Sequence, residues 1–205
     1  MKIICVGMNY AAHNKELQNP LILQNPTIFL KPDISLLKDG KPFFMPDFSE
    51  KIQYETEIVV RIGRLGKNIA KRFAHRYYDE ISVGIDITAR DLQQEFRMKG
   101  LPWELSKSFD NSAVVGDFVP LANLARKIDA LNFHLDINGK TVQKGNSGDM
   151  LFGVDEIIAY VSKFMTLKIG DLIFTGTPAG VGNLYVNDHL QAWLEDKKVL
   201  DFYVK

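Results

Sequence analysis

The sequence lacks an excess of either charge. Its 205 residues carry 25 Lys and Arg against 25 Asp and Glu, so the formal net charge is zero. Proteins that bind nucleic acid usually carry a basic excess, because they displace counterions from phosphates. Docking on anionic lipid likewise requires a cluster of basic residues. We therefore expect neither nucleic acid nor a membrane as a partner.

Cysteine, long apolar runs and linkers are also scarce. Cys5 is the only cysteine, so no disulfide can form within the chain, which fits a reducing, cytoplasmic location. No stretch approaches the roughly 18 to 20 consecutive apolar residues of a membrane-spanning helix. No internal repeat, low-complexity tract or Gly/Ser linker divides the chain. We expect residues 1–205 to form a single domain.

Short strand patterns dominate what is present. Ile52–Ile62 alternates between two faces, as a strand does. Leu131–Ile137 also alternates and runs into Asn138-Gly139, a strong hairpin signal, so Lys140–Lys144 can return antiparallel to it. Further strand candidates are Lys2–Val6, Thr27–Lys31, Asp171–Thr175, His189–Leu194 and Val199–Val204.

Helix patterns are fewer. The candidates are Asn9–Leu17, Asp91–Lys99 and Asp155–Met165, and the second of these stops at Gly100. Thr88 is a candidate N-cap for that helix. Together the patterns predict an α+β fold, a mostly antiparallel β-sandwich or roll with peripheral helices.

Three acids could converge on a cation. Glu55 and Glu57 lie two residues apart in a strand, so their side chains point the same way, with Cα atoms about 6.5 to 7 Å apart. Carboxylate oxygens suit Mg²⁺ or Ca²⁺, and without a cation the two charges raise each other's pKa. A solvated strand face is the alternative, but the apolar run Ile58–Val60 follows and indicates burial. Asp86, between two isoleucines, could supply a third carboxylate.

Two further groups suggest catalysis. His13 and Glu16 lie three residues apart on one face of a predicted helix, so the carboxylate can orient the imidazole as a general base. A surface ion pair is the alternative. Lys107, between a Trp-containing turn and Phe109, could face an anionic substrate, or it could be an exposed lysine lying along the surface.

The loop Thr175–Gly182 follows an apolar strand and is rich in glycine and threonine. Its backbone N–H groups and hydroxyls can hold a carboxylate. It is not a nucleotide-binding Walker loop, since no Gly-Lys-Ser/Thr follows. A plain turn at the end of a strand is the alternative.

The order of these segments resembles the fumarylacetoacetate hydrolase family. The segments that carry the resemblance are Gly7–Glu16, Phe29–Pro32, Tyr54–Glu57, Gly84–Gln93, Lys99–Trp103, Ser106–Phe109 and Thr175–Gly182. The resemblance extends over nearly the whole chain and is to the short members, which have only the catalytic domain. Lys-Gly-Leu-Pro-Trp and Ser-Lys-Ser-Phe look most similar to acylpyruvate hydrolases that also decarboxylate oxaloacetate.

The resemblance implies a β-sandwich roll, usually a homodimer, with one Mg²⁺ per active site, or Mn²⁺ or Ca²⁺ in its place. The residues it implies are Glu55, Glu57 and Asp86 for the metal, His13, Glu16 and Lys107 for catalysis, and Thr177, Arg90 and Gln93 for substrate binding. Two positions depart from the family pattern. Many members have His where Tyr54 stands, and some acylpyruvate hydrolases have Arg where Met8 stands.

The activity implied is metal-dependent hydrolysis of a carbon–carbon bond in a 3-acylpyruvate, of the fumarylpyruvate or acetylpyruvate type, together with decarboxylation of oxaloacetate. The alternative keeps the site and changes the reaction. It is isomerisation or decarboxylation of an unsaturated 2-oxo dicarboxylate from aromatic catabolism, of the 2-hydroxyhepta-2,4-diene-1,7-dioate isomerase type. A non-catalytic, metal-stabilised binding module is a third interpretation, and the adjacent His13–Glu16 pair argues against it.

Overall fold

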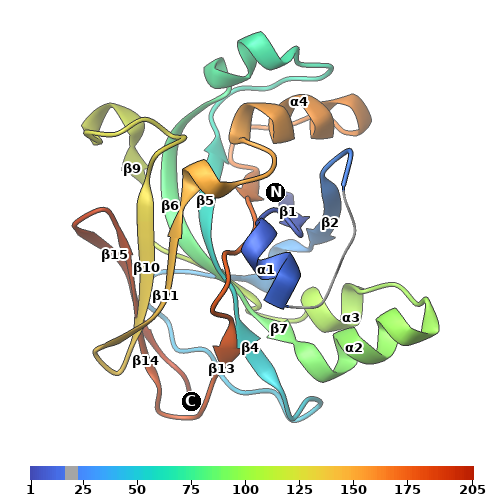
Figure 1. Cartoon of the computed structure of the whole chain (residues 1–205), viewed down its shortest axis with the longest axis vertical. Coiled ribbons are helices and arrows are strands. Elements are labelled where there is room, and N and C mark those ends of the chain that lie inside the picture. The colour runs from blue at the N-terminus through green and yellow to red at the C-terminus, as the bar shows by residue number, and fades with distance from the viewer. Residues whose placement is uncertain (17–22) are drawn as a thin grey trace.

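The strands form curled, mostly antiparallel sheets. The computed structural model describes residues 1–16 and 23–205. Within these ranges the strands build three sheets, the largest with eight strands (Figure 1). Its strands lie in the order β2 (Thr27–Lys31), β1 (Ile3–Gly7), β12 (Leu172–Phe174), β5 (Thr56–Ile62), β6 (Tyr78–Asp86), β8 (Ala113–Val115) and β3 (Leu36–Leu37), with β9 (Val119–Pro120) also beside β6.

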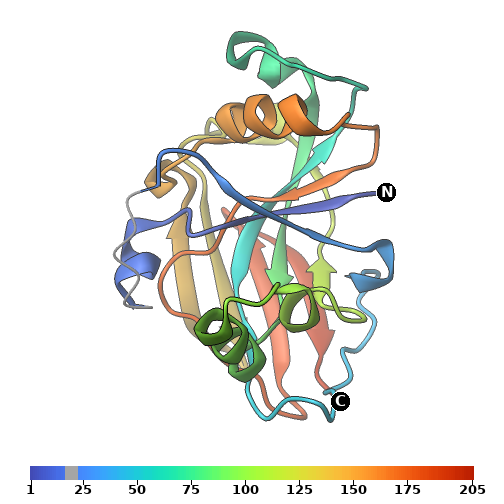
Figure 2. The same cartoon turned by 90° about the vertical axis from the view of Figure 1, so that its right-hand side faces the viewer.

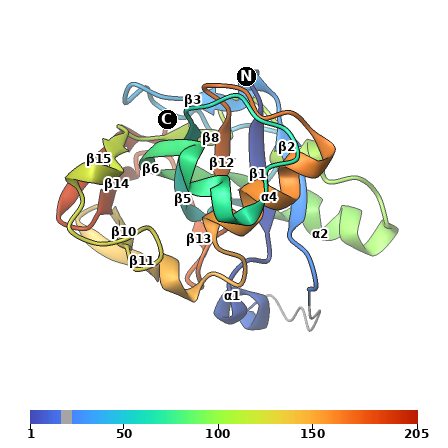
Figure 3. The same ribbon diagram turned by 90° about the horizontal axis from the view of Figure 1, so that it is seen from above.

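Two smaller sheets complete the set. The four-stranded sheet has the order β11 (Lys140–Asn146), β10 (Asn132–Ile137), β14 (His189–Leu194) and β15 (Lys197–Tyr203). The three-stranded sheet has the order β13 (Gly182–Asn183), β4 (Ile52–Tyr54) and β7 (Thr88–Ala89). Both are antiparallel throughout, whereas β1 pairs with β12, and β3 with β8, in parallel. Seen from above, the four-stranded sheet lies to one side of the large one (Figure 3).

The main hydrophobic core joins the two larger sheets. Alternate residues of β14, Leu190, Ala192 and Leu194, are fully buried and share one cluster with Ile58 and Val60 of β5. The residues between them on β14 are half-buried, so one face of this strand is accessible to solvent. In β5, six of the seven residues are buried, because core packs on both of its faces. Glu57, the second residue of β5, therefore has little access to water.

Four α-helices in the described ranges lie outside the sheets (Figures 1 and 2). They are α1 (Ala11–Glu16), α2 (Arg90–Lys99), α3 (Glu104–Lys107) and α4 (Val154–Phe164). Short 3₁₀ turns are η1 (Asp33–Ser35), η2 (Lys71–Arg76), η3 (Leu121–Asn123) and η4 (Ser147–Asp149). None of these helices has the length and apolar character needed to cross a bilayer.

The predicted fold class is confirmed, and the differences are local. The first helix ends at Glu16, and the predicted end at Leu17 lies outside the described residues. The predicted strand 52–62 is broken at Glu55, where the chain passes from the three-stranded to the eight-stranded sheet. The N-cap prediction for Thr88 is wrong, since Ala89 occupies that position and Thr88 belongs to β7. The helix stop at Gly100 is confirmed, with the left-handed φ of 64° that favours glycine.

Candidate active site

Glu55, Glu57 and Asp86 meet in the interior and are called the acid cluster below. One oxygen from each lies within 4.8 Å of the others, and the three residues are only 6%, 2% and 1% exposed. Neighbouring strands bring them together, since Glu55 and Glu57 flank the start of β5 and Asp86 ends the adjacent β6. The backbone N–H of Asp86 donates to the carbonyl of Glu55 over 2.8 Å, which fixes the register there.

Three buried cations surround the acid cluster. Lys107 Nζ donates to Glu55 Oε2 and Asp86 Oδ2, both over 2.7 Å. Its third N–H donates to the hydroxyl of Thr88 over 2.6 Å. Arg90 pairs with Glu55 Oε1, and Lys31 Nζ lies 2.8 Å from Asp86 Oδ1 without hydrogen-bond geometry. Glu55 and Asp86 are therefore each bracketed by two cations.

Glu57 differs from the other two acids because no described Lys, Arg or His side chain forms an ion pair with it. Its Oε2 instead accepts the backbone N–H of Gly176 over 2.7 Å. Burial raises the pKa of Glu57, and the charges of Asp86 and Glu55 raise it further. For Glu55 burial also favours a higher pKa, but the charges of Lys107 and Arg90 outweigh it and the net pKa is lowered. Positive charge is thus scarce at one point of the cluster, beside Glu57.

A divalent cation fits that point. Three carboxylate oxygens form a hard donor set of the kind that Mg²⁺, Mn²⁺ and Ca²⁺ prefer. The free space in the adjoining pocket is about 30 Å³. This is enough for an ion or a water molecule. A substrate of several carbon atoms therefore requires the surrounding side chains to move.

The predicted general base lies in the same pocket. His13 is 4% exposed, lines the pocket, and its Nδ1 is 3.1 Å from Glu16 Oε2. A carboxylate only accepts hydrogen bonds, so Nδ1 carries the proton and Nε2 is left as the basic nitrogen. Glu16 also accepts the backbone N–H of Gly180, at 3.2 and 3.3 Å from its two oxygens. The carboxylate that orients the base is thereby itself held by the loop.

The loop Thr175–Gly182 holds carboxylates, but they belong to the protein. Gly176 N–H binds Glu57 and Gly180 N–H binds Glu16, so one loop ties the acid cluster to the base. Gly176 has a φ of 99°, and a Cβ there would lie 2.7 Å from the Cβ of Asn9. Only glycine fits this close approach without strain.

Thr177 is buried and lines the pocket, but its hydroxyl is already engaged. It donates to the carbonyl of Thr56 over 2.9 Å and accepts from Gln143 Nε2 over 2.8 Å. Arg90 and Gln93 also line the pocket and bind each other, and Arg90 Nε donates to Gln53 Oε1 over 2.7 Å.

Eight of the nine predicted site residues therefore line one pocket. The exception is Glu16, which reaches it through His13. Lys107 was predicted to face the substrate, whereas here all three of its N–H groups contact the protein. The pocket also takes in residues that the sequence analysis left without a role, namely Val6, Gly7, Phe29, Arg97 and Trp103.

Three buried polar residues that support the site were missed. Lys31 contacts the acid cluster and donates to Ser112 Oγ over 3.0 Å. Asn9 binds the carbonyl of Thr175 over 2.7 Å. Gln143, on the four-stranded sheet, accepts the N–H of Thr56 over 3.0 Å. The position of Lys31 at the end of an apolar strand was a usable signal for its role. The contacts of Asn9 and Gln143 join residues more than 80 positions apart, so no local signal in the sequence indicated them.

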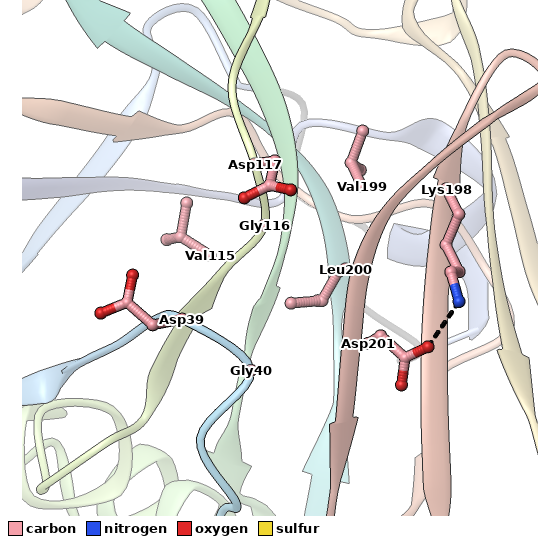
Figure 4. Close-up of a pocket in the computed structure, with 9 residues that line it drawn as sticks. All are labelled: Asp39, Gly40, Val115, Gly116, Asp117, Lys198, Val199, Leu200 and Asp201. Carbon is pink, nitrogen blue, oxygen red and sulfur yellow. Dashed lines mark hydrogen bonds and ion pairs between the residues drawn. The ribbon is translucent and has the colours of Figure 1, made fainter.

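A second hollow, of about 250 Å³, shares no residue with the acid cluster (Figure 4). Figure 4 shows the side chains of Asp39, Asp117 and Asp201 pointing in different directions. Asp201 is paired with Lys198 over 2.6 Å. This hollow has no converging set of ligands, so the acid cluster is the better candidate site.

The chain is similar to known proteins along its whole length. The sequence model described as fumarylacetoacetate hydrolase C-terminal matches residues 2–205. A mitochondrial oxaloacetate tautomerase of Mus musculus is 41% identical over 203 residues, which are 99% of this chain and 91% of that protein.

Two solved structures extend the comparison. The fumarylpyruvate hydrolase from Pseudomonas aeruginosa in complex with Mn²⁺ and pyruvate is 31% identical, with a TM-score of 0.92 over 100% of this chain and 89% of that one. The 2-hydroxyhepta-2,4-diene-1,7-dioate isomerase from Mycobacterium marinum is 30% identical, with a TM-score of 0.84 over 99% of this chain and 73% of that one.

Proposed function

We propose that this chain, which belongs to the fumarylacetoacetate hydrolase family, is a divalent-metal-dependent enzyme that interconverts the enol and keto forms of oxaloacetate. The reaction moves one proton between carbon C3 and the oxygen on C2. The observation that supports it is the placement of a carboxylate-oriented base, His13, in one pocket with the acid cluster and Lys107. Proton transfer at carbon needs a base and a site that stabilises the enolate.

The metal would be held by Glu55, Glu57 and Asp86, and Mg²⁺ is the proposed ion, with Mn²⁺ or Ca²⁺ as substitutes. The similar structure from Pseudomonas aeruginosa that contains Mn²⁺ supports a divalent ion. Such an ion supplies a Lewis acid that polarises the 2-oxo group and offsets the negative charge of the enolate.

The chain's own residues handle the proton. His13 Nε2 accepts the proton from C3 and passes it to the C2 oxygen, and in the reverse direction it takes the proton from that oxygen and returns it to C3. Glu16 holds Nδ1–H and stabilises the imidazolium that carries the proton between the two atoms. Burial favours a lower pKa for Lys107, but Asp86 and Glu55 outweigh it and the net pKa is raised. Lys107 is therefore a protonated donor, and one of its three N–H groups can turn from the protein to the C2 oxygen.

The choice of oxaloacetate depends on the relatives. The Mus musculus tautomerase and the Homo sapiens one, at 38% identity over 99% of this chain, carry that activity in their names. This moves the first candidate from acylpyruvate hydrolysis, which the sequence analysis placed first, to oxaloacetate. Acylpyruvate hydrolysis remains the second candidate, because the same base can activate water and a similar structure is titled a fumarylpyruvate hydrolase.

The test follows enol loss by ultraviolet absorbance, with oxaloacetate, fumarylpyruvate and acetylpyruvate side by side, in Mg²⁺ and in EDTA. Oxaloacetate should be tautomerised faster than in buffer, and EDTA should abolish the effect. His13→Gln should lower kcat about 10²- to 10⁴-fold, the usual contribution of a general base. His75→Gln is the matched control, because His75 is exposed and lies outside the pocket.

Each result decides between the candidates. Cleavage of fumarylpyruvate without tautomerisation of oxaloacetate would favour the hydrolase. Tautomerisation that survives both EDTA and His13→Gln would contradict the proposed site.

Assembly, location and domain organisation stay predictions. We propose a homodimer, to be checked by light scattering at several concentrations. A cytoplasmic location can be checked by cell fractionation, and a single catalytic domain over residues 1–205 by limited proteolysis.

A further inference from the structure

Arg97 is a pocket residue that the proposed mechanism does not use. It lies on α2, seven residues after Arg90 and four after Gln93, so the three side chains fall on one helix face. All three line the pocket that contains the acid cluster. Its neighbour Trp103 also lines this pocket, and the guanidinium carbon of Arg97 lies 5.3 Å from the Trp103 ring centroid.

Arg97 differs from the other cations of the pocket in its partners. Lys107 and Arg90 are both paired with Glu55. Among residues 1–16 and 23–205, the Arg97 side chain forms no hydrogen bond or ion pair, and its guanidinium lies over the face of the Trp103 ring. An aromatic face orients a guanidinium but leaves its five N–H donors available.

The pocket has two ends of different character. The acid cluster, Lys107 and Arg90 lie at its buried end. Arg97 and Trp103 are half-buried, as is Phe29, whose ring meets that of Trp103 edge to face with centroids 6.2 Å apart. A 2-oxo acid bound with its reacting end at the acid cluster would therefore extend toward an apolar wall that carries one cation.

We propose that Arg97, oriented by Trp103, binds the second carboxylate of a 2-oxo dicarboxylate and so makes the enzyme prefer dianionic substrates to monoanionic ones. The inference deepens the proposed function and rests on it. A guanidinium can bind a carboxylate through two parallel N–H···O bonds, which supplies both affinity and orientation. Oxaloacetate and fumarylpyruvate both carry such a remote carboxylate, whereas acetylpyruvate does not.

The electrostatics of the free pocket agree with an anion at this point. Burial lowers the pKa of Arg97, and the charge of Arg90 lowers it further. The charge of Glu55 opposes these two effects in part, and a carboxylate bound directly to the guanidinium would oppose them further.

A purely structural role is the competing explanation. Arg97 lies in the last turn of α2, where a cation stabilises the helix dipole. In that case its removal would lower the melting temperature without changing the preference between ligands of different charge. The ratio of the affinities for a dianionic and a monoanionic ligand therefore distinguishes the substrate-binding role of Arg97 from the structural one, whereas the melting temperature does not.

The decisive pair of ligands is oxaloacetate and 2-oxosuccinamate, in which an amide of the same shape replaces the remote carboxylate. We expect the intact protein to have a kcat/KM about 10- to 100-fold higher for oxaloacetate, the usual range for a charge-assisted hydrogen bond. Arg97→Met should abolish this ratio by weakening oxaloacetate alone, and Arg97→Lys should retain part of it. Lys99→Met is the matched control, because it removes the same charge from an exposed position of the same helix.

Binding measurements separate this inference from the proposed function. The affinities of both ligands for the Mn²⁺-loaded protein are measured by calorimetry, whether or not turnover occurs. A ratio that collapses in Arg97→Met supports the inference even if oxaloacetate is not the physiological substrate. An unchanged ratio, or an equal loss for both ligands, would overturn it.

Discussion

The same substitution at two glutamates only two positions apart should have opposite effects on the metal-free protein. Glu55 is paired with Lys107 and Arg90, whereas Glu57 has no cationic partner among the described residues and faces two other carboxylates. We predict that Glu55→Gln destabilises the protein in EDTA and that Glu57→Gln stabilises it. Glutamine keeps the shape of the side chain, and at Glu57 it can still accept the N–H of Gly176.

The geometry sets the size of the two effects. At 4.8 Å and an effective dielectric constant of about 20, two like charges repel by about 3.5 kcal/mol. Glu57 has two such neighbours, but nearby cations offset most of this repulsion, which leaves a gain on the order of 1 to 3 kcal/mol for Glu57→Gln. Breaking the buried ion pairs of Glu55 costs about 3 to 5 kcal/mol. For a chain of 205 residues, these values correspond to melting shifts of about 2 to 12 °C upward and 6 to 20 °C downward.

The dependence on pH has a definite sign. Burial and the charges of Asp86 and Glu55 raise the pKa of Glu57, so the unfolded state releases this proton more readily. Protonated Glu57 therefore makes its full contribution to the free energy of unfolding below the usual glutamate pKa. This contribution is lost as the pH rises toward the raised pKa of the folded state. The advantage of Glu57→Gln should therefore be near zero in acid and grow with pH. Since the pKa of Glu55 is lowered, the penalty of Glu55→Gln should shrink as the pH falls.

The assay is thermal melting of the protein and both variants in EDTA, from acid to neutral pH, repeated in Mg²⁺ and Mn²⁺. Ligand binding at 100 times the dissociation constant stabilises a protein by about 2.7 kcal/mol. The unmodified protein should gain this on adding the ion, and Glu57→Gln should gain little, so their order can reverse. If Glu57→Gln melts below the unmodified protein in EDTA at neutral pH, the reasoning is refuted.

Two further substitutions test the supports of the site, and a third tests an ion pair outside it. Lys31→Met removes a fully buried cation from the acid cluster and should lower the free energy of unfolding by about 3 to 5 kcal/mol in urea titrations; a loss below about 1 kcal/mol would contradict its role. Gly176→Ala places a Cβ 2.7 Å from that of Asn9 and should destabilise the protein by about 1 to 3 kcal/mol, whereas an unchanged melting temperature would show that the loop relaxes freely. The pKa of Asp201 is lowered, chiefly by its hydrogen bond from Lys198, so the stability it contributes is present above the usual aspartate pKa and lost as the pH falls. Asp201→Asn should therefore lower stability slightly at neutral pH and not in acid, and 1 M salt should reduce the difference because the side chain is partly exposed.

Much of the acid cluster could be predicted because its signals are local. Glu55 and Glu57 share a face by strand periodicity alone, and the apolar residues after them indicated a buried strand. Asp86 was recognised as an acid between isoleucines, and the hairpin at Asn138-Gly139 by its turn chemistry, which β10 and β11 confirm.

What could not be predicted depends on contacts between distant segments. Thr88 has the composition of an N-cap, but its hydroxyl accepts from Lys107, 19 positions later, and this tertiary contact prevails over the local preference. The break in the strand at Glu55 was missed because alternation continues through it. Only the pairing of β4 with β7, and of β5 with β6, shows that the chain changes sheets there.

The amide of Gln143 has a consequence for how the protein opens. From the four-stranded sheet it accepts the N–H of Thr56 and donates to Thr177 and to the carbonyl of Pro178. The backbone between the two glutamates is thus bonded to a strand of another sheet, and neither sheet can separate without exposing that amide. Hydrogen exchange at Thr56 should therefore occur only through global unfolding. We therefore expect the acid cluster to open with the last cooperative unit, and the half-buried end of the pocket to open before it.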